Sequence, residues 1–239
     1  MRFSILSWNV EAFRGSEAQL TSVATHVRNP QLNPDVFGLF EVENVDIISL
    51  MSNHLPEYDY SLTDGPENKE ILVGVRRGKF EQSIFSQKRE FKVYNPYLRP
   101  GALITATLAG EMYNILFLHT DSGTDAGGFG NRDEMSDKIW KLKRTIDGLS
   151  TSGKGRLIVL GDLNTMGLQF PRPKKTDVRV SEADEINALQ SLAAESDMRL
   201  LTKEFSATFN NLKEQSDLDH ILATNNIKFT ELAANGKKF

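Results

Sequence analysis

A short apolar run near the middle of the chain constrains the fold most. It consists of Leu157-Ile158-Val159-Leu160 between two glycines, and it leads into Asp162 and Asn164. Four bulky apolar residues bounded by glycines are typical of a strand that is buried on both faces. Gly161 allows a sharp bend, so both polar side chains are expected on a turn. Such a turn is often only a loop feature, but Asp can orient or deprotonate water and an Asn amide can donate to an oxyanion, as phosphate cleavage requires.

Three other apolar runs also end in polar side chains. They are Ile5-Leu6-Ser7-Trp8 before Asn9 and Glu11, Val36-Phe37-Gly38-Leu39-Phe40 before Glu41, and Ile115-Leu116-Phe117-Leu118 before His119. Strands that each deliver a polar group at the carboxyl end build a shared site at one rim of a sheet sandwich. The repetition therefore favours a functional site over a set of unrelated turns.

These motifs resemble those of the endonuclease/exonuclease/phosphatase family. This family of Mg-dependent phosphodiesterases includes pancreatic-type DNase, exonuclease III-like abasic-site endonucleases and neutral sphingomyelinases. The matching motifs, in family order, are Trp8-Asn9-Val10-Glu11, Phe40-Glu41-Val42, Gly161-Asp162-Leu163-Asn164 and Asp217-Leu218-Asp219-His220-Ile221-Leu222. The resemblance implies an α/β fold, a four-layer α/β/β/α sandwich of two mixed sheets, formed by residues 1–239 as a single domain.

Composition limits the metals and partners that fit this chain. The 239 residues include no cysteine, so any metal must be held by Asp, Glu, Asn or His. Oxygen donors favour Mg²⁺, with Mn²⁺ as an alternative, over zinc. The net charge of −4 argues against a broad, sequence-independent grip on nucleic acid, although a local basic groove is compatible with it. The chain shows neither a signal-peptide pattern nor a membrane-spanning run, so a cytoplasmic location is the default expectation, although a processed precursor would look the same. A monomer is expected.

The order of expected elements is compatible with this fold. A capping box at Ser16 predicts a helix that ends before Pro30, and Asn44 is expected to cap a second helix with Ile47, Ile48, Leu50, Met51 and Leu55 facing inward. Tight turns between Tyr58 and His119 predict antiparallel hairpins. Later helices are expected over 134–149 and after Ser181, and the last strands over 217–223 and 227–232.

The resemblance assigns the main site residues. Glu41 matches the acid that binds Mg²⁺, and Asn9 and Glu11 match the pair that flanks the metal. Asp162 matches the residue that orients or deprotonates the attacking water, and Asn164 the residue that holds the phosphate. Each also has a plainer interpretation as a polar strand end or a turn.

His119 and Arg99 have weaker motifs. His119 matches a phosphate-binding histidine of the DNases and sphingomyelinases, but a histidine at a strand end is more often a hydrogen-bonded core or rim residue. Arg99 either donates a planar fork to the phosphate or pairs with a surface acid. His26 and His54 lie in helix patterns and receive no role.

Two further segments suggest substrate contacts. The glycine-rich stretch 120–132 is interpreted as a mobile lid in which Phe129 touches substrate, or as a plain surface loop. A basic patch that could guide a polyanion, or is merely solvated surface, is formed by Arg172, Lys174, Lys175 and Arg179.

The resemblance is incomplete near the C-terminus. Family members carry an Asp in a strand, matched by Asp219, and then a second motif, Ser-Asp-His, whose histidine contacts phosphate. No second Asp-His follows Asp219, and His220, its neighbour on a strand, is expected to point to the opposite face. Truncation or divergence would explain this, and we expect weak or no activity from this chain.

The sequence thus predicts metal-dependent hydrolysis of phosphodiester bonds, with a nuclease as the first choice. Phospholipid and small-molecule phosphodiesterases or phosphatases share the same residues, so they stay open. A further alternative is a phosphate- or nucleic-acid-binding protein that has lost catalysis together with the terminal histidine.

Overall fold

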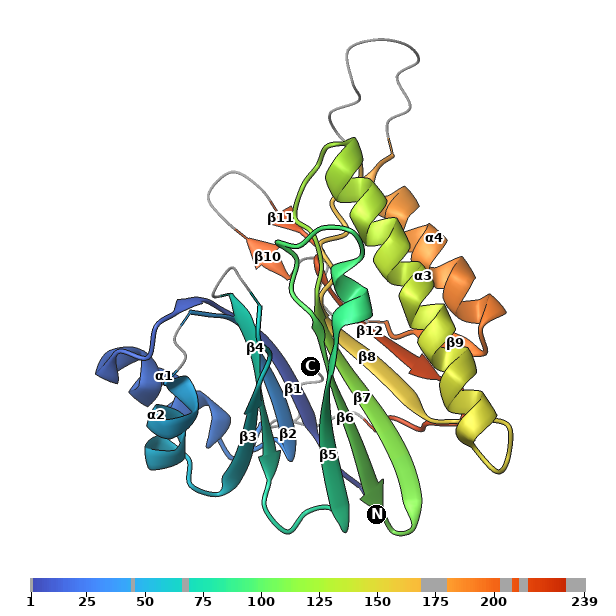
Figure 1. Ribbon diagram of the computed structural model, residues 1–239. Coiled ribbons are helices and arrows are strands. Elements are labelled where there is room, and N and C mark those ends of the chain that lie inside the picture. Colours follow the sequence, from blue (N-terminus) through green and yellow to red (C-terminus); the bar gives the residue numbers. More distant parts are fainter. Residues whose placement is uncertain are drawn as a thin grey trace. The chain divides into compact units, whose positions relative to one another are not determined.

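The protein has an α/β fold with two mixed β-sheets and flanking helices, as its computed structural model shows (Figure 1). The structure describes residues 2–43, 46–65, 69–168, 180–202, 208–210 and 215–230. Contacts divide the chain into two compact units. The first unit comprises Met1–Lys92 and Pro96–Leu118, and the second comprises Val93–Asn95 and His119–Phe239.

The first unit contains a complete four-stranded sheet. Its strands, in spatial order, are β1 (Ile5–Phe13), β2 (Val36–Val42), β4 (Glu70–Arg76) and β3 (Tyr58–Leu62). The pair β1 and β2 is parallel, and both other pairs are antiparallel. A parallel pair needs a crossover connection, which here is α1 (Glu17–Val27). The carboxyl ends of β1 and β2 therefore meet at one edge of the sheet.

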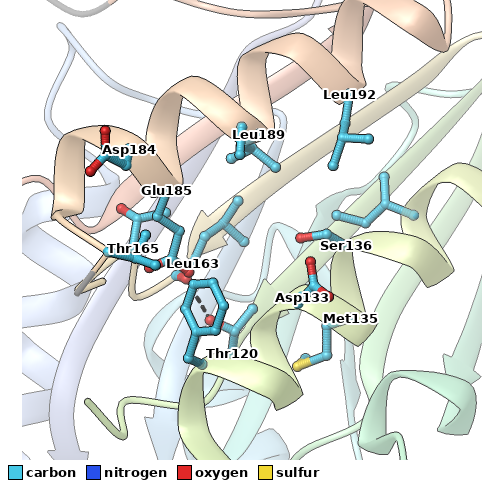
Figure 2. A pocket seen from close by; sticks show the side chains of 14 residues that line it. Thr120, Asp133, Met135, Ser136, Leu163, Thr165, Asp184, Glu185, Leu189 and Leu192 are labelled. Atoms are coloured by element: carbon cyan, nitrogen blue, oxygen red, sulfur yellow. Dashed lines mark hydrogen bonds between the residues drawn. The ribbon is translucent and has the colours of Figure 1, made fainter. Parts of the chain in front are cut away.

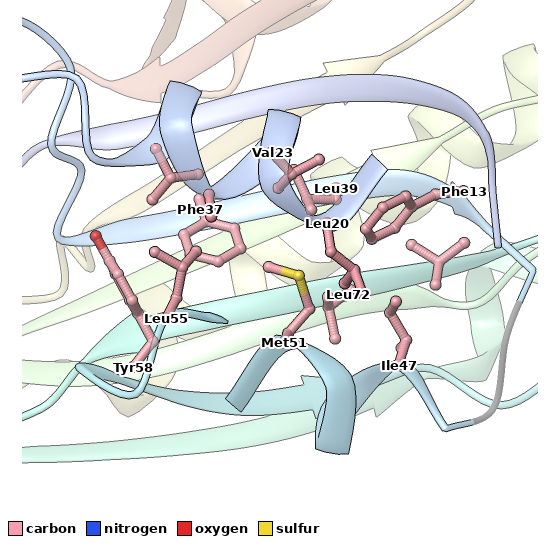
Figure 3. Packing of buried hydrophobic residues seen from close by; sticks show 13 residues of the cluster. Phe13, Leu20, Val23, Phe37, Leu39, Ile47, Met51, Leu55, Tyr58 and Leu72 are labelled. Atoms are coloured by element: carbon pink, nitrogen blue, oxygen red, sulfur yellow. The ribbon is translucent and has the colours of Figure 1, made fainter. Parts of the chain in front are cut away.

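Two helices cover one face of this sheet. Helix α1 begins with the predicted capping box, in which Ser16 and Gln19 bond each other's backbone, and α2 (Ile47–His54) follows β2. Figure 3 shows how their apolar side chains meet those of the sheet in one cluster, including Leu20, Val23, Ile47, Met51, Phe37, Leu39 and Leu72. Ile48 was predicted to face inward, but it is 37% exposed, because the short α2 buries only one narrow stripe.

The other face of this sheet packs against antiparallel strands of the same unit. These are β5 (Gln82–Lys88), β6 (Gly101–Leu108) and β7 (Glu111–His119), with the 3-10 helix η1 (Arg89–Lys92) between β5 and β6. A Cβ placed on Gly38 of β2 would lie only 2.3 Å from a ring carbon of Phe117 in β7. The absence of a side chain at Gly38 thus allows the two layers to pack closely.

The second unit places helices beside its own strands. Its elements are α3 (Ala126–Leu149), β8 (Leu157–Asp162), α4 (Glu182–Glu195), β9 (Met198–Leu200), β12 (Asp219–Thr224) and the short pair β10 (Phe209–Asn210) and β11 (Gln215–Ser216). Strand β12 runs antiparallel to both β8 and β9. All six residues of β8 are buried, as its apolar pattern predicts. Ser181 forms the predicted capping box with Asp184.

The predicted lid over 120–132 is wrong for its second half, because α3 already begins at Ala126. Asp125 caps this helix by accepting a hydrogen bond from the backbone of Gly128, at 2.8 Å. A Cβ on Gly128 would collide with the Gly123 backbone, at 2.3 Å. The glycines therefore allow tight packing at a helix start, and Phe129 is a helical residue.

The predicted strand over 227–232 is absent from its described part, since residues 227–230 form no strand. Leu149, at the last position of α3, is 81% exposed. Asn44 and the basic residues Arg172, Lys174, Lys175 and Arg179 lie outside the described residues. No helix in the described ranges has the length and apolar character needed to cross a membrane.

The close packing at Gly38 predicts that alanine lowers the stability of the protein at this glycine but not at an uncrowded one. Gly38→Ala should lower the free energy of unfolding by about 1–3 kcal/mol, because its methyl group must displace the Phe117 ring. Gly130→Ala is the control, since this glycine lies in α3 with open space around it, and alanine there should stabilise by roughly 0.5–1 kcal/mol. Urea denaturation measures both, and equal stability of Gly38→Ala and wild type would contradict the packing argument.

Candidate active site

In the first unit, Asn9 in the middle of β1, just before its register shift, meets Glu41 near the carboxyl end of β2. Asn9 Nδ2 donates to Glu41 Oε1 at 3.2 Å, and Asn9 Oδ1 accepts from the backbone N–H of Glu11 at 3.1 Å. Glu11 and Glu41 both have positive φ, 46° and 61°, so the backbone leaves regular strand geometry where these side chains project. Asn9 thereby orients the Glu41 carboxylate.

The predicted metal ligands are only partly brought together. The Glu11 side chain is exposed, and the backbone amide of Glu11 donates to Asn9. Among the described residues, no three His, Asp or Glu side chains cluster closely enough to hold a metal. Mg²⁺ is often held by one or two carboxylates while water and substrate phosphate complete its shell. Glu41, partly buried and oriented by Asn9, fits such a site.

Besides Glu11 and Glu41, the first unit has a buried acid, Glu70, that was missed by the sequence analysis. Glu70 is 7% exposed. In the β2–β4 register it lies opposite Val42, which is the residue that follows Glu41 in the sequence. The Thr63 hydroxyl donates to its carboxylate and also accepts from the backbone of Ile71 at 2.9 Å. The available signal was an acid that begins an otherwise apolar strand.

Arg99 contacts the backbone just before Glu70. Its Nε donates to the carbonyl oxygen of Lys69 at 2.7 Å, and the side chain is partly buried. This carbonyl is neither of the two partners that the sequence predicted for Arg99, which were a phosphate and a surface acid. The phosphate role of Arg99 stays a prediction.

In the second unit, His119 and Asp162 form a buried pair. They are 4% and 7% exposed, and His119 Nε2 lies 3.8 Å from Asp162 Oδ2. Asp162 Oδ1 accepts from the backbone N–H of Asn164 at 3.2 Å. The structure therefore brings His119 together with the Asp162–Asn164 motif, which the sequence predicted separately.

Hydrogen bonds to backbone carbonyls fix this arrangement. The Thr120 amide donates to the Asp162 carbonyl at 2.9 Å, and Asn164 Nδ2 donates to the Thr120 carbonyl at 3.2 Å. The Thr120 hydroxyl donates to the Leu163 carbonyl at 2.6 Å, and both residues line the pocket in Figure 2. Asn164 has a φ of 45°, a conformation that asparagine tolerates better than most residues. The turn after β8 and the residue after His119 are thus locked together.

Asp219 and His220 point to opposite faces, as predicted. Asp219 lies opposite Asp162 in the register of β12 and β8 and is partly buried. His220 is 2% exposed, and its Nε2 lies 2.7 Å from the Thr165 hydroxyl and 2.9 Å from the Asp217 carbonyl. Because the Thr165 proton goes to that same carbonyl at 2.7 Å, Nε2 must carry a hydrogen. His220 is a structural residue in this position.

A separate small pocket of about 80 Å³ lies between α3 and α4 (Figure 2). It is lined by apolar side chains such as Met135, Leu163 and Leu189, and by acidic Asp133 and Glu185. Burial, followed by repulsion from Asp137 and Glu185, raises the pKa of Asp133. None of His119, Asp162 and Asn164 lines this pocket.

Comparison with known proteins identifies the family. The sequence model described as "Endonuclease/Exonuclease/phosphatase family" matches residues 6–233. The chain belongs to this family. It is therefore a phosphoesterase of the hydrolase type, as the resemblance implied. A search of curated protein sequences gives no match.

Solved structures confirm the DNase-like fold. Truncated Caenorhabditis elegans TDP2 matches with a TM-score of 0.62 and 17% identity over 94% of this chain and 84% of that one. Bacteroides thetaiotaomicron mannosyl-6-phosphatase matches with 0.60 and 16%, over 94% and 86%. Danio rerio (D. rerio) TDP2 in complex with single-strand DNA product matches with 0.61 and 14%, over 99% and 94%. At these identities the likeness shows the fold alone.

The hydrogen bonds of Thr165 predict a specific loss of stability. Thr165→Val keeps the shape but leaves His220 Nε2 and the Asp217 carbonyl without their hydroxyl partner, which should lower the free energy of unfolding by about 1–3 kcal/mol. Thr145→Val is the matched control on the exposed side of α3, with an expected change within about 0.5 kcal/mol. Equal unfolding midpoints for the two variants would contradict the structural role of His220.

Proposed function

We propose that this protein is a metal-dependent phosphodiesterase whose substrate is a nucleic acid. The observation that carries the proposal is the buried group of His119, Asp162 and Asn164 at the end of β8, in which side-chain atoms bond backbone groups and each other. A buried acid next to a histidine and an amide donor suits attack of water on phosphorus. A cytoplasmic location and a monomeric state belong to the same proposal.

Each residue of this group has a role in the proposed reaction. Asp162 orients or deprotonates the attacking water, and the proton passes to its carboxylate. His119 and the Asn164 amide donate hydrogen bonds to the phosphate oxygens, whose negative charge grows in the transition state. Asp219 supports this group from β12, opposite Asp162.

The metal side of the proposal rests on the first unit. Glu41 would hold Mg²⁺ or Mn²⁺, Asn9 would orient that carboxylate, and Glu11 would add a ligand through water. When bound, the metal polarises the phosphate and neutralises the charge of the leaving oxygen. Arg99, whose Nε donates to the Lys69 carbonyl, would donate a further hydrogen bond to the phosphate.

The choice of nucleic acid is supported by the similar structure of D. rerio TDP2, which is in complex with a single-strand DNA product. A small phosphate ester is the second candidate, because another relative is a mannosyl-6-phosphatase and the net charge of −4 does not favour a broad grip on nucleic acid. A phosphate-binding member without turnover is the outcome that the missing second Asp-His motif would predict.

The first test compares substrates and a catalytic variant. The wild type should hydrolyse bis(p-nitrophenyl) phosphate and single-stranded DNA with Mg²⁺ or Mn²⁺ and not with chelator. Asp162→Asn should lower kcat by about 10²–10⁴-fold, because it removes the acceptor of the water proton. Glu195→Gln, an exposed change on α4, is the control and should keep wild-type kcat.

The results separate the candidate functions. Turnover of a sugar phosphate but of neither diester would replace the nucleic-acid substrate with the small phosphate ester. No turnover of any probe by the folded wild type would contradict the catalytic proposal.

Metal binding is tested without turnover. Mg²⁺ or Mn²⁺ should raise the melting temperature of the wild type, because a ligand that binds only the folded state stabilises it. Glu41→Gln should remove most of this increase, whereas Glu195→Gln should keep it. An unchanged increase in Glu41→Gln would exclude Glu41 as the ligand.

A further inference from the structure

A buried arginine in α3, Arg132, binds two loops of the second unit at once. It is 3% exposed, and its Nε and Nη2 donate hydrogen bonds to the Glu185 carboxylate of α4 at 2.7 and 3.1 Å. Nη1 donates to the carbonyls of Asp121 and Gly123 at 3.1 and 2.6 Å, and Nη2 also donates to the carbonyl of Gly167 at 2.8 Å. All three guanidinium nitrogens therefore have partners.

Glu185 binds the second loop as well. Its Oε2 accepts from the backbone N–H of Gly167 at 2.7 Å, while the Gly167 carbonyl is held by Arg132. Gly167 has a φ of 74°, and a Cβ there would lie 2.3 Å from the Val180 carbonyl. This position therefore requires glycine, and the ion pair binds its peptide groups on both sides.

The two loops are those that carry the proposed catalytic group. Asp121 and Gly123 follow His119 within four residues, and Gly167 follows Asn164 within three. Where the loops begin, they are already joined by the hydrogen bonds between Thr120, Asp162 and Asn164. The Arg132–Glu185 pair adds a second connection a few residues further along both loops.

We propose that Arg132 is a positioning residue that, with Glu185, sets the relative placement of His119 and the Asp162–Asn164 turn. The inference rests on the proposed function for its effect on turnover. Arginine is required because its planar fork reaches a carboxylate and carbonyls in several directions, whereas a lysine ammonium is a compact point charge. Arg132 does not touch substrate in this proposal.

The main test is Arg132→Lys, which keeps the charge opposite Glu185 and loses most carbonyl contacts. We expect kcat per folded molecule to fall by roughly 10²-fold while KM stays within about threefold, because misplacing reacting groups by about 1 Å affects chemistry more than binding. Arg144→Lys, an exposed change on the same helix, is the matched control and should keep wild-type values.

A second readout needs no turnover. The imidazole NMR signal of His119, identified by its absence in His119→Gln, should shift in Arg132→Lys and stay in place in Arg144→Lys. If the wild type hydrolyses no probe, the proposed function fails, and a shifted His119 signal still supports the positioning role. Unchanged kcat together with an unmoved His119 signal would overturn it.

Glu185→Gln covers the case in which Arg132→Lys does not fold. A glutamine has one oxygen and one NH₂ group, so it cannot accept from Arg132 on both atoms and also from Gly167. We expect a smaller fall in kcat and a His119 shift in the same direction. A folded Glu185→Gln with wild-type kcat and an unmoved His119 signal would contradict the proposal.

Discussion

The hydrogen bond from the Thr120 amide to the Asp162 carbonyl is the contact on which the candidate catalytic group depends. It joins the residue after His119 to the last residue of β8. The side-chain amide of Asn164 donates to the Thr120 carbonyl and so makes a second bond between the same two segments. Because both bonds satisfy backbone carbonyls in a buried region, leaving either unmade would cost free energy. The side chains are therefore placed by the chain path itself, not by surface loops.

Glycine has two different roles in this protein. At Gly38 it allows two layers of the first unit to approach, since any side chain would meet Phe117. At Gly128 and Gly167 it lets a helix start and a turn pack against other backbone. The stretch 120–132 looks flexible in the sequence because glycine is common in mobile loops, but the same residue is needed for tight packing. Composition alone does not separate these cases.

The two proposed functional groups differ in how they are built. Asn9 and Glu41 lie on neighbouring parallel strands, Asn9 in the middle of β1 and Glu41 near the end of β2, and the Asn9 side chain orients the acid. His119, Asp162 and Asn164 are buried, and hydrogen bonds that involve the backbone groups of Thr120, Asp162 and Asn164 hold them in place. The first arrangement leaves an oriented carboxylate for a cation, and the second leaves little freedom for its side chains. This contrast matches the different demands of binding a metal and positioning a proton acceptor.

The sequence by itself determined the family, the fold class and most elements, because apolar periodicity, capping boxes at Ser16 and Ser181, and motifs next to strand ends are local signals. It also predicted that His220 points away from Asp219, since strand side chains alternate. Only the tertiary structure showed the start of α3 at Ala126, the burial of Glu70 and the contacts of Arg132. The contacts of Arg132 with Gly167 and Glu185 join residues 35 and 53 positions apart, Glu70 is buried by strand pairing, and the start of α3 packs against the Gly123 backbone, none of which a short window of sequence contains.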